Sequence, residues 1–208
     1  MSTHSLICKK NNDKDTVGIY CHNDGYIENT GFILQTFYNT PEKIDELLEL
    51  GDLSRLDYRI GEQVDFYKTY ADADYYNQCE NQCIAYHRDK GEELHQYRCV
   101  NESAYLRMLN KCRESYNYVY ENNQWFVGTV NYDDKENKIE FQPLVDALKE
   151  NEYLNDEKYQ SIYINDSSIT GEERSKIIDT FSTLGILKEE VLHQHENDES
   201  KEDESLEP

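Results

Sequence analysis

The sequence contains few glycines, few prolines and few basic residues, and it lacks any long apolar run. Its 208 residues include 9 Gly, 3 Pro and 21 Lys or Arg, against 43 Asp or Glu, for a formal net charge of −22. No apolar stretch approaches the roughly 20 residues of a membrane-spanning helix, and no apolar signal-peptide segment follows Met1. The sequence therefore predicts no membrane span and a location in the cytoplasm.

Two further classes of protein are disfavoured by what is missing. A direct nucleic-acid binder needs positive surface charge, because a phosphate backbone repels a body as acidic as this one. The sequence also has no Walker loop, no Gly-x-Gly-x-x-Gly fingerprint and no Gly-x-Ser-x-Gly elbow. These absences favour a non-enzymatic protein, and we expect neither a cofactor nor a metal.

The charge is unevenly distributed along the chain. Residues 189–208 hold nine acidic residues and one Lys with little apolar content, which is typical of a disordered acidic tail. Residues 87–113, in contrast, contain six basic and four acidic residues. Acidity of this kind serves solubility, or it imitates the charge density of DNA if the acidic side chains share one face.

The first part of the chain contains the clearest secondary-structure signals. Residues 4–10 and 16–22 flank a polar turn and are expected to form a β-hairpin. Thr40 is the expected N-cap of a helix that begins at Pro41 and ends at Gly51.

The later part of the chain predicts a mixture of short elements, with a loop and some strand over residues 57–78. Asn101 or Ser103 is expected to cap the helix that follows, and Leu106 and Leu109 are expected on its buried face. The expected strands lie at residues 82–88, 116–121, 124–132, 138–142 and 160–164, and the expected helices at residues 29–38, 101–115, 143–150 and 171–184.

This order of elements lacks regular alternation of strand, helix and strand, so it predicts an α+β fold. We expect residues 1–150 to form an α+β domain of two antiparallel hairpins packed with three to four helices. Residues 151–188 would form a C-terminal extension of helix and strand, and residues 189–208 the acidic tail.

Six cysteines occur without a signal peptide, which argues against a disulfide framework. Cys79, Cys83 and His87 follow one another at four-residue intervals, and His95 and Cys99 repeat that interval, a spacing loosely compatible with zinc. The simpler interpretation is free thiols that behave as small apolar side chains. The sequence leaves open whether Cys79, Cys83, His87 and Cys99 bind zinc.

Two short segments place titratable side chains in turns. His22 and Asp24 follow the first predicted hairpin, and His87 and Asp89 lie in the densest ionisable stretch. The four side chains could serve as metal ligands or as an acid–base pair if the fold brought them within about 6 Å. The same residues also suit structural turns, or an Arg–Asp pair that holds a loop.

Tyrosines and aspartates alternate over residues 58–76, and further acids follow toward residue 157. Tyr supplies rigid, amphipathic contact area, so it is favoured at recognition surfaces, although tyrosines here could equally cover a core. An acidic, Tyr-rich surface suits a basic groove, because carboxylates pair with Lys and Arg, and aromatic rings stack on guanidinium planes. The candidate binding residues are Asp65, Tyr70, Asp72, Asp74, Tyr75, Tyr76, Asp133, Asp134, Glu136, Glu152, Asp156 and Glu157.

Residues 18–31, GIYCHNDGYIENTG, resemble a motif of uncharacterised proteins of bacteriophages and mobile elements, typically G-I-Y-C-H-W-D-G-Y-P. This sequence has Asn23 in place of the Trp and Ile27 in place of the Pro. The resemblance covers roughly residues 5–130, and it implies an accessory protein of a phage or integrated element in a low-GC bacterium, with no catalytic residue to assign. Later pieces that resemble the same family in the same order are residues 47–56, residues 85–92 and the aromatic hairpin around Trp125.

Together these observations predict a small, acidic, non-enzymatic inhibitor. Its acidic surface would mimic DNA and occupy the basic nucleic-acid groove of a host defence protein, such as a restriction or CRISPR effector, in the bacterial cytoplasm. The expected partner is that host protein, not a nucleic acid or a membrane, and a homodimer is left open. The alternatives are a small metal-dependent enzyme that uses the four His and Asp side chains of the two turn segments, or a structural component of the element.

Overall fold

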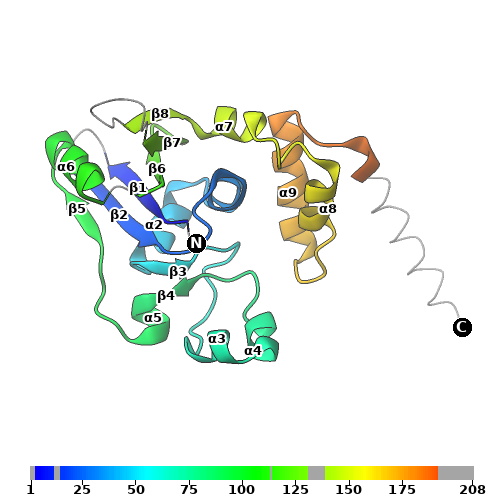
Figure 1. The fold of residues 1–208 in the computed structure, drawn as a ribbon, viewed down its shortest axis with the longest axis horizontal. Coiled ribbons are helices and arrows are strands. Elements are labelled where there is room, and N and C mark those ends of the chain that lie inside the picture. Colours follow the sequence, from blue (N-terminus) through cyan, green and yellow to red (C-terminus); the bar gives the residue numbers. More distant parts are fainter. Residues whose placement is uncertain (1–2, 12–14, 113, 131–138, 192–208) are drawn as a thin grey trace, which may run out of the picture. The chain divides into compact units, whose positions relative to one another are not determined.

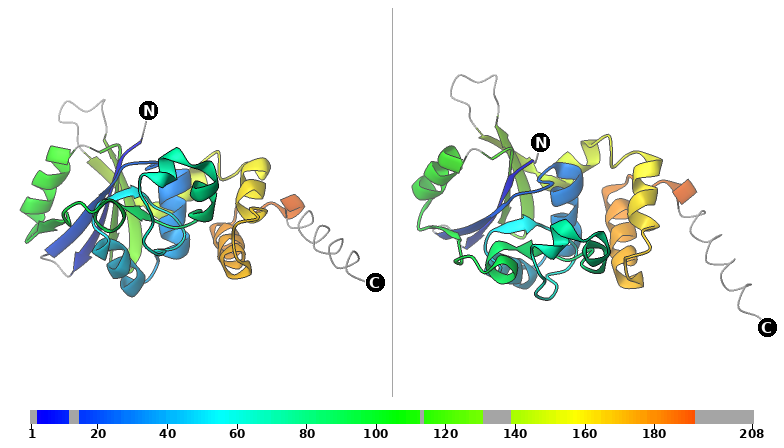
Figure 2. Two further views of the ribbon diagram at one scale, coloured as in Figure 1. Left: turned by 90° about the horizontal axis from the view of Figure 1, so that it is seen from below. Right: turned by 60° about the horizontal axis from the view of Figure 1, so that its bottom comes forward.

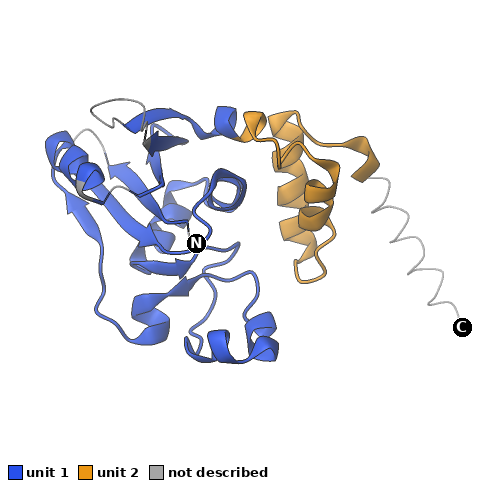
Figure 3. Ribbon diagram, in the orientation of Figure 1, with its two compact units in different colours: residues 1–147 blue, residues 148–208 orange. Residues whose placement is uncertain are grey.

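The fold is given by a computed structural model (Figure 1) that describes residues 3–11, 15–112, 114–130 and 139–191. The chain divides into two compact units, residues 1–147 and residues 148–208 (Figure 3). This division lies close to residue 150, where the sequence predicts the end of the α+β domain. Within the described ranges, no helix has the length and apolar character needed to cross a bilayer.

The first unit is built on one mixed sheet of eight strands. The strands are β1 (Ser5–Asn11), β2 (Asp15–Cys21), β3 (Leu53–Arg55), β4 (Ile84–Ala85), β5 (Tyr97–Cys99), β6 (Tyr116–Glu121), β7 (Gln124–Val130) and β8 (Ile139–Pro143). Their order across the sheet is β4-β3-β2-β1-β6-β7-β8. β5 also pairs with β2, over Thr16–Gly18, whereas β3 pairs with β2 only at Cys21.

Both predicted hairpins are confirmed. β1 pairs antiparallel with β2, and β6 pairs antiparallel with β7. The second hairpin turns at Asn122 and Asn123, whose φ angles are 52° and 61°, a conformation that Asn tolerates and that matches the twist of the strands. The prediction of separate antiparallel hairpins needs one correction: β1 and β6 pair in parallel, which joins the two hairpins into a single mixed sheet.

The helices confirm most of the predicted boundaries, including those at 171–184. Their bounds are η1 (Ile27–Gly31), α1 (Phe32–Phe37), α2 (Pro41–Glu49), α3 (Lys68–Ala71), α4 (Ala73–Gln78), α5 (Tyr86–Lys90), α6 (Glu102–Cys112), α7 (Leu144–Glu150), α8 (Glu157–Ile164) and α9 (Gly171–Leu184).

The caps of α2 and α6 form as predicted. The Thr40 hydroxyl accepts a hydrogen bond from the backbone N–H of Lys43 at 3.4 Å, and Pro41 occupies the first turn of α2. The Asn101 side chain likewise accepts from the N–H of Ala104 at 2.9 Å at the start of α6. One residue of α6 was predicted wrongly, because Leu106 is exposed and Tyr105 is buried in its place.

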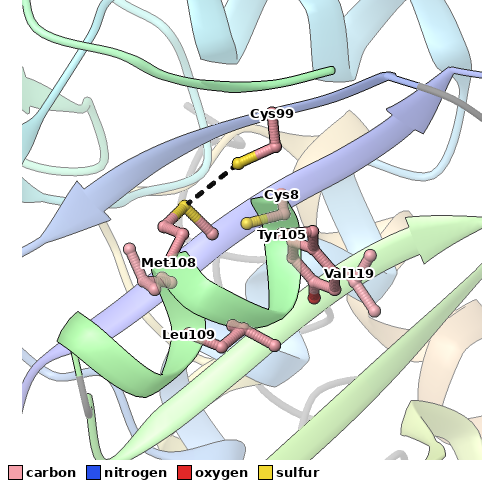
Figure 4. Close-up of a cluster of buried hydrophobic side chains, with 7 residues drawn as sticks. Cys8, Cys99, Tyr105, Met108, Leu109 and Val119 are labelled. Atoms are coloured by element: carbon pink, nitrogen blue, oxygen red, sulfur yellow. Dashed lines mark hydrogen bonds between the residues drawn. The ribbon is translucent and has the colours of Figure 1, made fainter. Parts of the chain in front are cut away.

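Helix α6 covers one face of the sheet. Its side chains Tyr105, Met108 and Leu109 are buried against Cys8 of β1 and Val119 of β6 (Figure 4). Since neighbouring residues of a strand point to opposite faces, the fully buried Ile7 and Ile19 face the other side.

The second face of the sheet is covered by the segment from η1 to α2 (Figure 2). Aromatic side chains of β6 and β7 donate hydrogen bonds to backbone carbonyls of this segment and of the turn that precedes it. The Tyr118 hydroxyl donates to the carbonyl of Gly25 at 2.9 Å, and Trp125 Nε1 donates to the carbonyl of Tyr38 at 2.8 Å. The aromatic rings thus bury apolar area while satisfying carbonyls that lie outside helices and strands.

Two predicted strands are wrong or much shorter than expected, and one predicted loop is partly helical. Residues 57–67 form a loop with an isolated bridge from Arg59 to Gln82, as predicted, whereas residues 68–78 form the short helices α3 and α4. Residues 160–164 belong to helix α8. In α8 the buried residues Gln160, Tyr163 and Ile164 follow a helical spacing, although residues 160–164 were predicted to form a strand. Of residues 82–88, only Ile84 and Ala85 form a strand, and the chain then turns into α5.

The second unit contains α8 and α9. α9 begins at a capping box, in which the Thr170 hydroxyl and the Glu173 carboxylate each accept the backbone N–H of the other residue. The fully buried Gln160 side chain donates to the carbonyls of Leu154 and Ile186 at 2.7 and 2.8 Å. This amide therefore ties the start of the unit to the chain that follows α9.

Candidate functional site

The segment that carries α3 and α4 exposes the tyrosines that the sequence singles out. The side chains of Tyr67, Tyr70 and Tyr76 are 68, 65 and 39 % exposed. Asp65, Asp72 and Asp74 are exposed beside them. We call residues 65–76 the Tyr/Asp surface; its members Tyr70, Tyr76 and the three aspartates were predicted binding residues, whereas Tyr67 was missed. The signal for Tyr67 was available, since it lies within the same Tyr-rich stretch.

The same segment also covers a small core, as the alternative interpretation expected. Phe66 is buried with Val64, Cys79 and Ile84, and the half-buried Tyr75 packs against this cluster. The Tyr/Asp surface therefore lies over this small apolar cluster, and only part of its aromatic area faces solvent.

Two aspartates of the Tyr/Asp surface shape the backbone. The Asp65 carboxylate accepts the N–H groups of Tyr67 and Lys68 at 3.1 and 3.2 Å, and Asp72 accepts the N–H of Tyr75 at 3.1 Å as the N-cap of α4. The backbone N–H of Asp65 in turn donates to the Tyr75 hydroxyl at 2.9 Å. These local hydrogen bonds explain why an Asp- and Tyr-rich stretch forms short helices.

The rings of this surface already bind cations of the same chain. The Arg55 guanidinium lies 4.8 Å from the centre of the Tyr76 ring, and the Lys68 ammonium lies 5.5 Å from that of Tyr75. The Tyr70 hydroxyl lies 2.7 Å from the Ser54 hydroxyl, which holds one edge of that ring. The surface can therefore receive guanidinium groups on its aromatic faces.

The other predicted acidic residues lie elsewhere. Glu152, Asp156 and Glu157 are exposed in the second unit, where the Asp156 carboxylate caps α8 by accepting the N–H of Tyr159 at 3.1 Å. The predicted acidic tail begins too early, because residues 189–191 are helical and Val191 is fully buried. The rest of the tail, residues 192–208, and three predicted residues of the β7–β8 connection lie outside the described residues. Those three residues are Asp133, Asp134 and Glu136.

The His and Asp residues of the two turn segments have local hydrogen-bond partners. The exposed Asp24 has a positive φ of 55°, and its carbonyl accepts from the Thr30 hydroxyl at 2.8 Å. The His87 ring donates from Nδ1 to the Glu92 carbonyl at 2.7 Å. In the part of the chain that the structure describes, no three His, Cys, Asp or Glu side chains are grouped so that they could hold a metal ion. His22, Asp24, His87 and Asp89 therefore do not form the metal-binding set that the enzyme alternative needs.

Asp89 serves the structure of the loops around α5. Its carboxylate is buried and accepts the backbone N–H groups of Val64 at 3.1 Å and Ala85 at 2.7 Å. It also accepts from the Arg88 guanidinium at 2.8 and 2.9 Å, and Arg88 donates further to the carbonyls of Ile60 and Cys83. This is the loop-holding Arg–Asp pair that the sequence suggested as the alternative.

His22 belongs to a ring cluster at the end of β2. Its Nδ1 lies 2.8 Å from the Tyr20 hydroxyl, and its ring centre lies 4.6 Å from that of His4. Burial and the neighbouring His4 lower the pKa of His22, and burial raises the pKa of Tyr20 to about 12. At neutral pH this cluster therefore holds an uncharged Tyr20 next to an imidazole that resists protonation.

A second pair, which the sequence did not predict, lies beside this cluster. His95 Nδ1 donates to the Asp52 carboxylate at 2.8 Å, and the other Asp52 oxygen accepts the backbone N–H of Tyr20 at 2.8 Å. Asp52 lies in the stretch 47–56, which carries part of the family resemblance, but the pairing with His95 joins residues too distant in sequence for spacing to predict.

The predicted thiol cluster is dispersed. Cys79 is buried below the Tyr/Asp surface, and Cys99 contacts Met108 on the face that α6 covers (Figure 4). Cys83 lies in a separate buried position, with its sulfur 3.4 Å from the Tyr38 hydroxyl. Burial raises the pKa of Cys83 to about 11, so it remains a protonated thiol.

No protein-family model matches the chain, and no curated protein and no solved structure is significantly similar to it.

Proposed function

We propose that this chain is a non-enzymatic accessory protein of a phage or mobile element, which inhibits a host nucleic-acid-binding defence protein such as a restriction or CRISPR effector in the bacterial cytoplasm. The observation that carries the proposal is the Tyr/Asp surface, where exposed tyrosine rings stand beside exposed carboxylates in a chain of net charge −22. A nucleic-acid groove is lined with Lys and Arg, so it offers cations to both kinds of side chain.

The internal cation–ring contacts of this surface support the chemistry proposed for the partner. Arg55 lies over Tyr76, whereas the rings of Tyr67 and Tyr70 are largely exposed. An arginine of the partner placed over either ring would gain about 0.5–2 kcal/mol, in the manner of Arg55. The aspartates beside these rings would replace the phosphates that the groove normally binds.

The excess of acidic residues would also accelerate the encounter. Opposite charges on two proteins steer diffusion, and this attraction falls as salt screens it over a Debye length of about 10 Å at 0.1 M. The proposed complex is therefore salt-sensitive and competes with DNA for the same groove.

The experiment uses two variants of the full chain with the same net charge. The first removes three exposed carboxylates beside or within the Tyr/Asp surface that do not cap a helix: Glu62→Gln, Asp74→Asn and Glu80→Gln. The matched control removes three exposed carboxylates from α2: Glu42→Gln, Glu46→Gln and Glu49→Gln. Because both variants lose three charges, they separate local contact from bulk acidity.

Host proteins are captured from extracts of a low-GC bacterium, and each captured protein is tested in competition with duplex DNA at about 0.05 M and about 0.3 M salt. We expect a DNA-binding protein that DNA displaces from the wild-type chain, about tenfold weaker binding by the first variant, and unchanged binding by the control. Binding that is indifferent to salt and to DNA, or equal loss in both variants, would refute the proposal.

A further inference from the structure

A groove on the α6 side of the sheet is chemically unlike the rest of this acidic protein. It lies between β5 and α6, has a volume of about 590 Å³, and is lined by residues that include His95, Arg98, Ala104, Arg107, Met108 and Glu114. This volume is in the range of small-molecule sites. The groove is distinct from the Tyr/Asp surface, which lies on α3 and α4, and it has no role in the proposed inhibition.

His95 is held in place at this groove although it is largely exposed. Its side chain is 57 % exposed, yet its Nδ1 donates to Asp52, its backbone carbonyl accepts the N–H of Asp52 at 3.2 Å, and its ring packs edge-on against Tyr97. The Asp52 carboxylate is itself fixed by the N–H of Tyr20. A hydrogen bond from Nδ1 to a carboxylate fixes the ring orientation and leaves Nε2 for a ligand.

Within the described residues, the positive charge of the two arginines in this groove is not neutralised by an ion pair. Arg98 donates only to the side-chain oxygen of Gln96, at 2.7 Å, and neither Arg98 nor Arg107 forms an ion pair with a carboxylate there. Both belong to the stretch 87–113, where basic residues outnumber acidic ones. Two guanidinium groups that face one groove without a carboxylate partner are suited to bind an anion.

We propose that this groove binds a small molecule that carries a phosphate group. The guanidinium groups of Arg98 and Arg107 bind the phosphate oxygens, and the ring of His95, oriented by Asp52, donates a third hydrogen bond from Nε2 when both of its nitrogens carry a proton. Ala104 and Met108 line the same groove, so they contact the apolar body of the ligand. Two guanidinium groups match the charge and the several oxygens of a phosphate better than those of a carboxylate.

Glu114 opposes this attraction and makes the proposal testable in both directions. Its carboxylate lines the groove, and burial raises its pKa, with His4 acting in the opposite direction. When ionised, the carboxylate repels the phosphate. The variant Glu114→Gln is therefore expected to strengthen phosphate binding severalfold, whereas loss of the two arginines weakens it.

The test is an NMR titration of the full-length, isotope-labelled chain with inorganic phosphate and with phenyl phosphate, at constant ionic strength. We expect saturable shifts of the amides around His95 and Arg107, tighter binding of phenyl phosphate than of inorganic phosphate, and no saturable shifts with acetate. The double variant Arg98→Gln/Arg107→Gln should bind at least about tenfold more weakly. The control Lys149→Gln/Lys158→Gln removes two exposed lysines of the second unit and should bind as the wild type does.

Absence of saturable phosphate binding by the wild-type chain overturns the proposal, as does equal weakening by both double variants. Acetate binding at the same amides overturns the assignment to phosphate. The spectra of the variants show directly whether they are folded, and Glu114→Gln provides a gain of affinity that a folding defect cannot imitate; unchanged or weaker binding by this variant also contradicts the proposal.

Discussion

At the scale of the residue, the carboxylate of Asp89 shows how a side chain that resembles a catalytic group performs a structural task. It is buried, accepts two backbone N–H groups and binds the Arg88 guanidinium through both oxygens. Buried carboxylates with fully satisfied oxygens are poor ligands, because each oxygen would have to surrender a hydrogen bond. The sequence placed Asp89 beside His87 and Arg88, but only the fold shows that its partners include Val64 and Ala85.

This role predicts a large loss of stability for Asp89→Ala. The substitution leaves the partly buried Arg88 guanidinium without its counter-charge and two buried N–H groups without acceptors, so we expect the free energy of unfolding to fall by about 3 kcal/mol. The control Asp74→Ala, at an exposed position on α4, should cost about 0.5 kcal/mol or less. Urea unfolding followed by circular dichroism measures both, and similar values for the two variants would contradict the structural role.

Exposure at the residue scale was predictable only in part. Tyr70 and Tyr76 were expected at a binding surface and are exposed, while Tyr105 was not expected in the core and is nearly fully buried. Tyr satisfies both environments, since its ring is apolar and its hydroxyl is polar. Residue type therefore does not decide between core and surface, and the packing of α6 on the sheet does.

At the scale of the element, local signals were reliable where a cap or a turn defined the boundary. α2 has a Thr cap and a Pro in its first turn, and α9 has a complete capping box. The helices α4 and α8 were missed or mistaken for other structure, because their signals are aspartate caps in segments without clear apolar periodicity. The helix α3, which was also missed, has no side-chain N-cap.

The turn between β6 and β7 gives a prediction at this scale. Asn123 has a φ of 61°, a left-handed conformation in which a Cβ without a hydrogen-bonding side chain is unfavourable. We expect Asn123→Ala to lower the free energy of unfolding by about 1 kcal/mol, and Asn123→Gly to leave it unchanged or raise it. Chemical denaturation of the two variants provides the comparison. Equal stabilities of the Ala and Gly variants would show that this backbone conformation is not costly.

At the scale of the whole molecule, the net charge of −22 acts on both stability and recognition. Like charges on one chain repel each other more strongly in the folded state, where they lie closer together. The same charges that would attract a basic partner therefore oppose folding, and salt should act on the two properties in opposite directions.

We accordingly expect the unfolding temperature to rise by about 3 °C, which corresponds to about 1 kcal/mol, when salt increases from about 0.05 M to about 0.5 M. Differential scanning calorimetry measures this rise, and sucrose at matched osmolality serves as a control without ions. A fall in the unfolding temperature with salt would indicate that attractive ion pairs, such as that of Lys9 with Asp45, outweigh the repulsion.

The sequence by itself determined the α+β class, both hairpins, the helices α2, α6 and α9 and the excess of negative charge, because each of these depends on residues close together in the chain. Only the tertiary structure decided that β1 and β6 pair in parallel, that Asp52 fixes His95, and that Arg98 and Arg107 face one groove. These relations join residues far apart in sequence. They are selected by the free energy of packing and hydrogen bonding, which produces no local pattern that one sequence would reveal.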